Sequence, residues 1–279
     1  MSTGSIKDKH QRIIVFLLFI ILVLGSIVIG TLNKISTMEK PESVEETTIE
    51  VVEIEKVEPV GKIAIIIDDF GYRNDAVSDG FLELDAELTY AVIPGHEYSR
   101  FMSNRANKLG YEVIVHMPME SSVPGFGEEE YVIEEAMPST EIERRMIKVL
   151  DHLPEAVGMN NHQGSKASAS ERVMNVMGLV LKDNNKYFLD SRTTVETKAE
   201  STMRSLGVLT GRRHVFLDND PAEDLIHKQV KVLAAKAKEN GVAVGIGHVK
   251  ENTLNVLKNA IPDLKEQNFE FVFISEIVE

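Results

Sequence analysis

The 279-residue chain contains no cysteine and no tryptophan, and aromatic residues make up only 6% of it. The absence of cysteine excludes disulfide bonds, thiolate metal sites, cysteine nucleophiles and a lipoprotein anchor. Any metal ion must therefore be held by histidine, aspartate and glutamate side chains.

Basic residues are also in deficit, because 30 Lys and Arg stand against 44 Asp and Glu, a net charge of -14. Phosphate binding needs lysine and arginine to displace counterions, so this charge argues against a nucleic-acid partner. It also disfavours tight electrostatic attachment to anionic lipids or wall polymers. Hydrophobic residues at 43% and charged residues at 27% are ordinary for a globular protein.

One long hydrophobic run is present near the N-terminus. Residues 13–33 carry no charge and are nearly all apolar, and about 20 helical residues cross a bilayer core. Lys7, Lys9 and Arg12 precede the run, which predicts a cytoplasmic tail over 1–12 and an extracytoplasmic C-terminal part. We therefore expect a single-pass membrane protein. A cleaved signal peptide is the alternative, but its apolar region would be shorter and no Ala-x-Ala cleavage site follows.

Residues 34–60 form an acidic segment with two prolines and no aromatic residue. Such a segment buries too little apolar surface to offset its ordering entropy, so we interpret it as an extended linker. Its alternation of valine or isoleucine with charged residues leaves a short edge strand as the alternative.

From residue 61 to 279 apolar runs alternate with amphipathic stretches, and no domain break interrupts them. The runs, apolar throughout, predict strands that are covered on both faces. They lie at 62–67, 88–93, 111–115, 187–189, 215–217, 242–246 and 269–274. Helices are predicted at 97–109, 140–153, 170–181 and 221–240, and Thr140 with Glu143 suggests a capping box. This alternation indicates an α/β fold with a mainly parallel sheet, closed or doubly wound.

Polar side chains follow several of the apolar runs directly. They are Asp68 with Asp69, His116, Asp190, Asp218 and His248. Because the carboxyl ends of parallel strands meet at one face, we expect these side chains to converge there. A further histidine, His162, lies in the polar segment 158–165, which we interpret as a loop shaped around a ligand.

Imidazoles and carboxylates together are a usual ligand set for zinc and related divalent ions. A bound ion lowers the pKa of a water molecule toward about 7, and nearby carboxylates and histidines can then move protons. The adjacent pair Asp68 and Asp69 could supply one carboxylate to the metal and one as a base. Neighbouring strand residues point in opposite directions, however, so this requires the strand to end at the pair, with Gly71 in the turn.

Six ordered motifs in this region resemble the divergent polysaccharide deacetylases, the YibQ-like family. They are IDDFG at 67–71, HMPME at 116–120, GMNNHQGS at 158–165, FLDSRT at 188–193, FLDN at 216–219 and GIGH at 245–248. The resemblance covers about residues 61–279. It implies a distorted (β/α) barrel with a divalent metal ion, as in the broader polysaccharide deacetylase superfamily.

The resemblance also implies roles for single residues. Asp68 is similar to the catalytic base and His248 to the general acid, while Asp69, His116 and His162 are similar to the metal ligands. The well-characterised deacetylases place their two metal histidines four residues apart, whereas here that second position holds Glu120, which therefore competes with His162 as a ligand. Three further residues are interpreted as supporting groups: Asp190, Arg192 and Asp218.

Each candidate also has a purely structural interpretation. Asp68 and Asp69 could form an ordinary turn, His116 could be a satisfied buried histidine, and His248 could cap a following helix. Glu120 could bond a backbone amide, Asp190 and Arg192 could form an ion pair, and Asp218 could start a helix.

The expected activity is removal of acetyl groups from an acetylated, extracytoplasmic glycan, with a divalent metal ion, zinc being the leading choice. The alternative is a weak or inactive deacetylase-like protein that binds glycan or acts as an envelope scaffold. A metal amidohydrolase acting on peptide bonds is a third possibility. The low aromatic content argues against both glycan interpretations, since sugars stack on aromatic rings. Candidates for such stacking are Tyr72, Tyr98, Phe126 and Tyr131.

Overall fold

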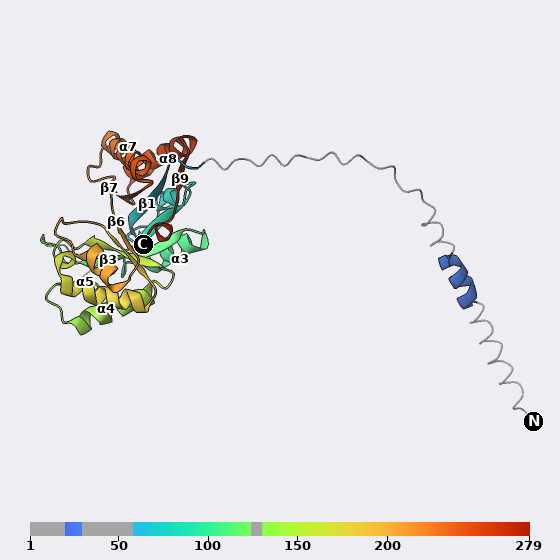
Figure 1. Cartoon of the computed structure of the whole chain (residues 1–279), viewed down its shortest axis with the longest axis horizontal. Coiled ribbons are helices and arrows are strands. Elements are labelled where there is room, and N and C mark those ends of the chain that lie inside the picture. Colours follow the sequence, from blue (N-terminus) through green and yellow to red (C-terminus); the bar gives the residue numbers. More distant parts are fainter. Residues whose placement is uncertain (1–19, 30–57, 124–129) are drawn as a thin grey trace, which may run out of the picture. The chain divides into compact units, whose positions relative to one another are not determined.

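The computed structural model describes residues 20–29, 58–123 and 130–279. The last two ranges belong to one compact unit (Figure 1). The predicted cytoplasmic tail, the ends of the predicted membrane segment and the linker up to residue 57 lie outside the described residues. Residues 20–29, inside the predicted membrane segment, are helical. No helix within the described ranges has both the length and the apolar character that a membrane crossing requires.

Nine strands in the described part form one sheet, and all their pairings are parallel. They are β1 (Gly61–Phe70), β2 (Leu88–Val92), β3 (Glu112–Met119), β4 (Gly158–Gln163), β5 (Tyr187–Asp190), β6 (Thr210–Arg212), β7 (Val215–Phe216), β8 (Val242–His248) and β9 (Phe269–Phe271). Their order is β6-β5-β4-β3-β2-β1-β8-β7, and β9 also pairs with β1. The two end strands, β6 and β7, do not pair with each other. The expected α/β class and parallel, barrel-like sheet are therefore confirmed, but the barrel is open, a parallel half-barrel, and closure of the sheet is wrong.

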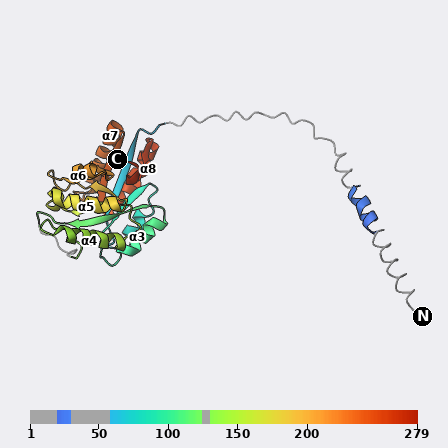
Figure 2. The same ribbon diagram turned by 60° about the horizontal axis from the view of Figure 1, so that its bottom comes forward.

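Seven α-helices connect the strands in the described part of this unit. They are α2 (Ala76–Phe81), α3 (Ser99–Lys108), α4 (Ser139–His152), α5 (Glu171–Asp183), α6 (Ala199–Leu206), α7 (Glu223–Asn240) and α8 (Glu251–Glu266). Figure 2 shows α4, α5 and α6 next to one another against the sheet, in agreement with their contacts. The four predicted helices are confirmed with ends that differ by one or two residues. The capping box at Thr140 is wrong, because α4 already begins at Ser139 and its N-cap, Pro138, offers no side-chain acceptor.

The sheet has two buried faces with different partners. The outer face packs against the helices through a large cluster that includes Ile65, Val115 and Met159. The inner face holds a smaller cluster: Ala64, Ile66, Ala91, Ile114, Tyr187, Leu189, Val244, Ile246, Val272 and Ile274. Side chains on a strand alternate between faces, so every second residue of β1, β3, β5 and β8 points into the half-barrel.

The C-terminal segment covers the amino-terminal end of this inner face. The backbone amide of Ser275 donates to the carboxylate of Glu112, which also accepts from Thr89 and from the hydroxyl of Tyr187. Buried polar groups need such partners, and these hydrogen bonds close the amino-terminal end of the half-barrel. A site open to a ligand is therefore expected at the opposite, carboxyl end of the strands.

The predicted ligand loop at 158–165 is wrong in its secondary structure, because residues 158–163 form β4, an interior strand of the sheet. Its sequence, GMNNHQ, has no apolar run, so hydrophobic periodicity does not identify it as a strand. The two asparagines are nevertheless buried and hydrogen-bonded, which removes the cost of placing polar side chains there. His162 is therefore held by the sheet.

Candidate metal and catalytic site

The inner face of the half-barrel ends in a layer of polar side chains. Counting on by two from the inner cluster leads from Ile66 to Asp68, from Ile114 to His116 and from Ile246 to His248. The register confirms their proximity, since the following residues are direct neighbours on adjacent strands: Asp68 and His248, His116 and Asn160, and Pro118 and His162. The sheet thus brings together residues up to 180 positions apart in the chain.

Asp69 joins this layer through a distortion of β1. The register between β1 and β2 shifts between Ile67 and Phe70, and Asp69 has a φ of 69°, in the left-handed region. Gly71 follows with a φ of 109°, and a Cβ at that position would lie 3.0 Å from the Cα of Ser99. The bulge turns a side chain that would otherwise point outward. We expected the strand to end at Asp68 and Asp69. It continues to Phe70 instead, but both carboxylates still reach the site.

Three ligand atoms form a small triangle. His116 Nε2 lies 3.0 Å from His162 Nδ1, and Asp69 Oδ1 lies 3.4 Å from each of these nitrogens. Asp69 Oδ1 is buried and makes no hydrogen bond. Among the described residues these three side chains are the group of histidines and carboxylates with metal-binding geometry.

The triangle fits a divalent ion. In a tetrahedral site with bonds of about 2.1 Å, neighbouring ligand atoms lie about 3.4 Å apart, close to the observed edges. Asp69 Oδ1 is also a buried acceptor without a donor, which is costly, and a cation held by the three atoms would satisfy it. The residues present therefore fit the metal that the sequence predicted.

The same arrangement shifts the acid–base behaviour of the protein without an ion. Burial alone lowers the pKa of His116, but the carboxylates of Asp68 and Asp69 outweigh it and raise this pKa to about 9. Burial acts to raise the pKa of Asp69, yet the two imidazoles hold it well below its usual range. A positive charge at this point is thus strongly favoured, whether a proton or a metal ion supplies it.

Asp68 lies beside the triangle. Its Oδ2 is 3.6 Å from His116 Nε2, and its Oδ1 accepts a hydrogen bond of 2.8 Å from the side-chain amide of Asn160. Burial raises the pKa of Asp68, so this carboxyl group has a stronger affinity for a proton than an exposed aspartate. Such a group is suited to accept a proton during a reaction.

A second histidine–carboxylate pair faces the same space. Asp218 Oδ1 lies 2.8 Å from His248 Nδ1, and Asp218 Oδ2 accepts from the His248 amide and from the Thr253 hydroxyl. Burial acts to lower the pKa of His248, but Asp218 outweighs it and raises it. Because the carboxylate accepts from Nδ1–H, Nε2 is the atom left to exchange a proton. His248 ends β8 and does not cap α8, whose N-cap is Lys250.

Comparison with known proteins identifies the family. The model of the divergent polysaccharide deacetylases matches residues 65–278. The chain belongs to this family. Within 206 aligned residues it is 36% identical to the Escherichia coli protein YibQ, covering 73% of this chain and 63% of YibQ, which is less than two thirds of that relative. A Haemophilus influenzae protein is 32% identical over 207 residues, covering 74% of this chain and 72% of that relative.

A crystal structure of the Agrobacterium tumefaciens protein ATU2773 has the same fold. Its TM-score is 0.75 at 17% sequence identity, covering 80% of this chain and 91% of that chain. At this identity the similarity concerns the fold alone. The suspected family is therefore confirmed by sequence, and the half-barrel by structure.

In this member of the family, Glu120 lies outside the candidate metal group. Its Oε1 forms an ion pair of 2.7 Å with Lys166, and its Oε2 accepts from the backbone amide of Glu135. The carboxylate thus joins loops that follow β3 and β4. The second imidazole comes from β4 through His162, which lies next to β3 in the register.

Asp190 and Arg192 also make hydrogen bonds that stabilise the local structure. Asp190 accepts from the backbone amide of Arg192 and from the hydroxyl of Thr197, which shapes the loop after β5. The carbonyl of Arg192 accepts from Arg213. Asp190 occupies an outward position on β5, between the inner residue Leu189 and the next inner position, Ser191.

Of the aromatic candidates in the described residues, Tyr72 is an exposed one. It is 40% exposed and its ring lies 4.1 Å from that of His96. Tyr98 and Tyr131 pack against the core, and Phe126 lies outside the described residues. Among the three candidates in the described residues, Tyr72 therefore offers the most exposed ring for a sugar to stack on.

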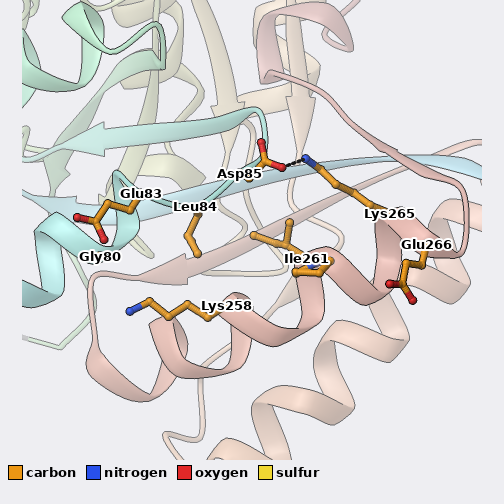
Figure 3. Close-up of a pocket in the computed structure, with 9 residues that line it drawn as sticks. Gly80, Glu83, Leu84, Asp85, Lys258, Ile261, Lys265 and Glu266 are labelled. Atoms are coloured by element: carbon orange, nitrogen blue, oxygen red, sulfur yellow. Dashed lines mark hydrogen bonds and ion pairs between the residues drawn. The ribbon is translucent and has the colours of Figure 1, made fainter.

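A cavity of about 500 Å³ lies away from these residues, between α8 and the segment that leads into β2 (Figure 3). Leu84 and Ile261 are among its apolar lining residues, and Asp85 pairs with Lys265 at 3.0 Å at one end of the group. None of the candidate metal or acid–base side chains lines it. The volume of this cavity therefore does not identify the position of the candidate metal site.

Proposed function

We propose that the protein is a metal-dependent hydrolase that removes acetyl groups from a carbohydrate of the cell envelope. The observation that carries the proposal is the triangle of Asp69, His116 and His162 flanked by two proton-transfer groups, Asp68 and His248. A ligand triad, a base and a separate acid are the parts that hydrolysis of an amide or ester needs. Membership of the divergent polysaccharide deacetylase family supports an acetylated glycan as the substrate.

Asp69, His116 and His162 would hold the ion, and two imidazoles with one carboxylate favour zinc. When bound, such an ion makes water more acidic and polarises the acyl carbonyl. Asp68 would take the proton of the attacking water. His248 would give its Nε2 proton to the departing amine or alcohol, while Asp218 keeps the imidazole oriented through Nδ1.

Elemental analysis of the purified chain and an acetate-release assay on acetylated amino-sugar oligomers test the proposal. Stoichiometric metal and acetate release would support the hydrolase. Metal without acetate from any acetylated glycan would instead favour the non-catalytic glycan-binding protein. Absence of metal after reconstitution with zinc would refute the hydrolase.

The pH dependence of turnover gives a test of the proposed acid. His248 must be protonated to act, and this form exists below its raised pKa, so activity should persist above about pH 6.5, the usual histidine value. It should fall as the pH rises further. Replacing Asp218 by asparagine removes the carboxylate that raises this pKa, so the alkaline limb of kcat should move to lower pH.

The same profile for Asp190→Asn serves as the control, because Asp190 is also a buried aspartate at a strand end but bonds to the loop after β5. An alkaline limb that stays in place in Asp218→Asn would exclude His248 as the titrating acid.

An extracytoplasmic location is part of the proposal and is supported by the hydrophobic run at 13–33 with its preceding basic residues. A C-terminal epitope tag should then be digested by protease added to spheroplasts. A cytoplasmic marker protein should remain intact in the same sample. Protection of the tag until the membrane is lysed would contradict this location.

A further inference from the structure

One fully buried amide links the metal group to the proposed base. Asn160 is 0% exposed, and its Nδ2 donates to Asp68 Oδ1 at 2.8 Å. Its Oδ1 lies 2.7 Å from His116 Nδ1. No other described side chain is hydrogen-bonded to both of these residues.

The orientation of this amide follows from what each partner can accept. An ionised carboxylate only accepts hydrogen bonds, so the NH2 group of Asn160 must face Asp68. The carbonyl oxygen then faces His116 and requires a proton on Nδ1. When the ring is neutral, this leaves the lone pair on His116 Nε2, the atom that faces Asp69 and His162. The amide thus selects the histidine tautomer that can bind a metal ion.

We propose that Asn160 is a positioning residue with two separable tasks: its oxygen fixes the metal-binding tautomer of His116, and its NH2 group holds Asp68 in place as an ionised base. The second task rests on the proposed hydrolase function. The first concerns metal binding alone and stands independently of any substrate.

The neighbouring residue provides a matched control. Asn161 is equally buried, at 1% exposure, and lies on the same strand. Its side chain points to the other face, where it bonds to the carbonyl of Gln163 and the backbone amide of Ser191. The same substitution at 160 and at 161 therefore compares the two faces of β4.

The test uses the full chain and three variants, Asn160→Asp, Asn160→Leu and Asn161→Asp, with zinc affinity from chelator competition and kcat for acetate release. The Asn160→Asp variant keeps the oxygen that accepts from His116 but replaces the NH2 donor to Asp68 by a carboxylate oxygen that repels it.

In Asn160→Asp, zinc affinity should stay within a few-fold of wild type while kcat falls by about 10–100-fold, the range for outer-shell partners. Leucine removes both bonds, so affinity and kcat should both fall by about 10–100-fold. Asn161→Asp should show no such split between affinity and turnover.

A measurement on the wild-type protein covers the case in which a variant does not fold. Nitrogen-15 NMR of the His116 ring should show a proton on Nδ1 in both the metal-free and the zinc-loaded protein. A proton on Nε2 alone would overturn the proposal, and so would unchanged zinc affinity in a folded Asn160→Leu variant. If wild type binds zinc but releases no acetate, the proposed hydrolase fails, while zinc affinity and the NMR signal still decide the first task. Equal losses of zinc affinity and kcat in Asn160→Asp would overturn the separation of the two tasks.

Discussion

Replacing Asp69 by alanine is expected to remove stoichiometric metal and, with it, acetate release. The Asp69 carboxylate supplies the anionic corner of the ligand triangle, and its Oδ1 has no hydrogen-bond partner that could compensate. Loss of a direct ligand should exceed the roughly 10–100-fold effect of an outer-shell partner on metal affinity. Elemental analysis after dialysis and zinc titration would measure both the stoichiometry and the affinity. His162→Ala should behave in the same way.

The backbone at Asp69 requires a folding control. Its φ of 69° costs about 1–2 kcal/mol for alanine, whereas asparagine tolerates this region. Asp69→Asn should therefore lose the metal without the backbone cost of alanine, and circular dichroism should show that the variant is folded. Glu120→Ala tests the alternative ligand, because it removes a carboxylate near β3 that is paired with Lys166. Normal metal content in Asp69→Asn together with loss in Glu120→Ala would reverse the ligand assignment.

Much of this site follows from the sequence because its residues stand directly after apolar runs. Asp68, His116 and His248 each follow a β-branched segment that forms a strand, and parallel strands deliver their ends to one face. The spacing by two from inner apolar residues then predicts which way each side chain points.

The same pattern does not distinguish Asp190 from these residues. Strands that are buried on both faces are apolar throughout, so the sequence does not reveal which of two neighbouring positions faces inward. Asp190 follows Leu189, an inner residue, and therefore points to the outer side, where it bonds to Thr197. The sequence thus predicted correctly that Asp190 lies at the carboxyl end of a strand, but it did not predict the direction in which the side chain points.

The role of Asn160 could not be predicted because its strand carries no hydrophobic signal. β4 reads as polar, and its asparagines are buried only because partners on β1, β3 and the loop after β5 satisfy them. Those partners are distant in sequence, so the strand and helix propensities of residues 158–163 do not reveal them. The bulge at Asp69 escaped prediction for a similar reason, since it depends on the register with β2.

Replacing Asp68 by asparagine is expected to leave the metal in place and lower kcat by about 100- to 10,000-fold, the contribution typical of a general acid or base. Asp68 lies outside the ligand triangle, and an asparagine oxygen at 68 could still accept from Asn160. Burial raises the pKa of Asp68, which means that the ionised carboxylate is costly in the fold. The neutral variant should therefore melt no lower than wild type. Calorimetry, elemental analysis and acetate release measure the three quantities.

This variant also separates the two proposed classes of protein. In a hydrolase, a folded and metal-loaded Asp68→Asn protein should bind an acetylated oligomer without turning it over, so its glycan affinity becomes measurable by calorimetry. In a glycan-binding protein, wild type and variant should bind the oligomer with similar affinity, and neither should release acetate. A variant that keeps its metal and the full kcat of an active wild type would show that Asp68 is not the base. The buried carboxylate would then have to be explained by its contacts with Asn160 and His116.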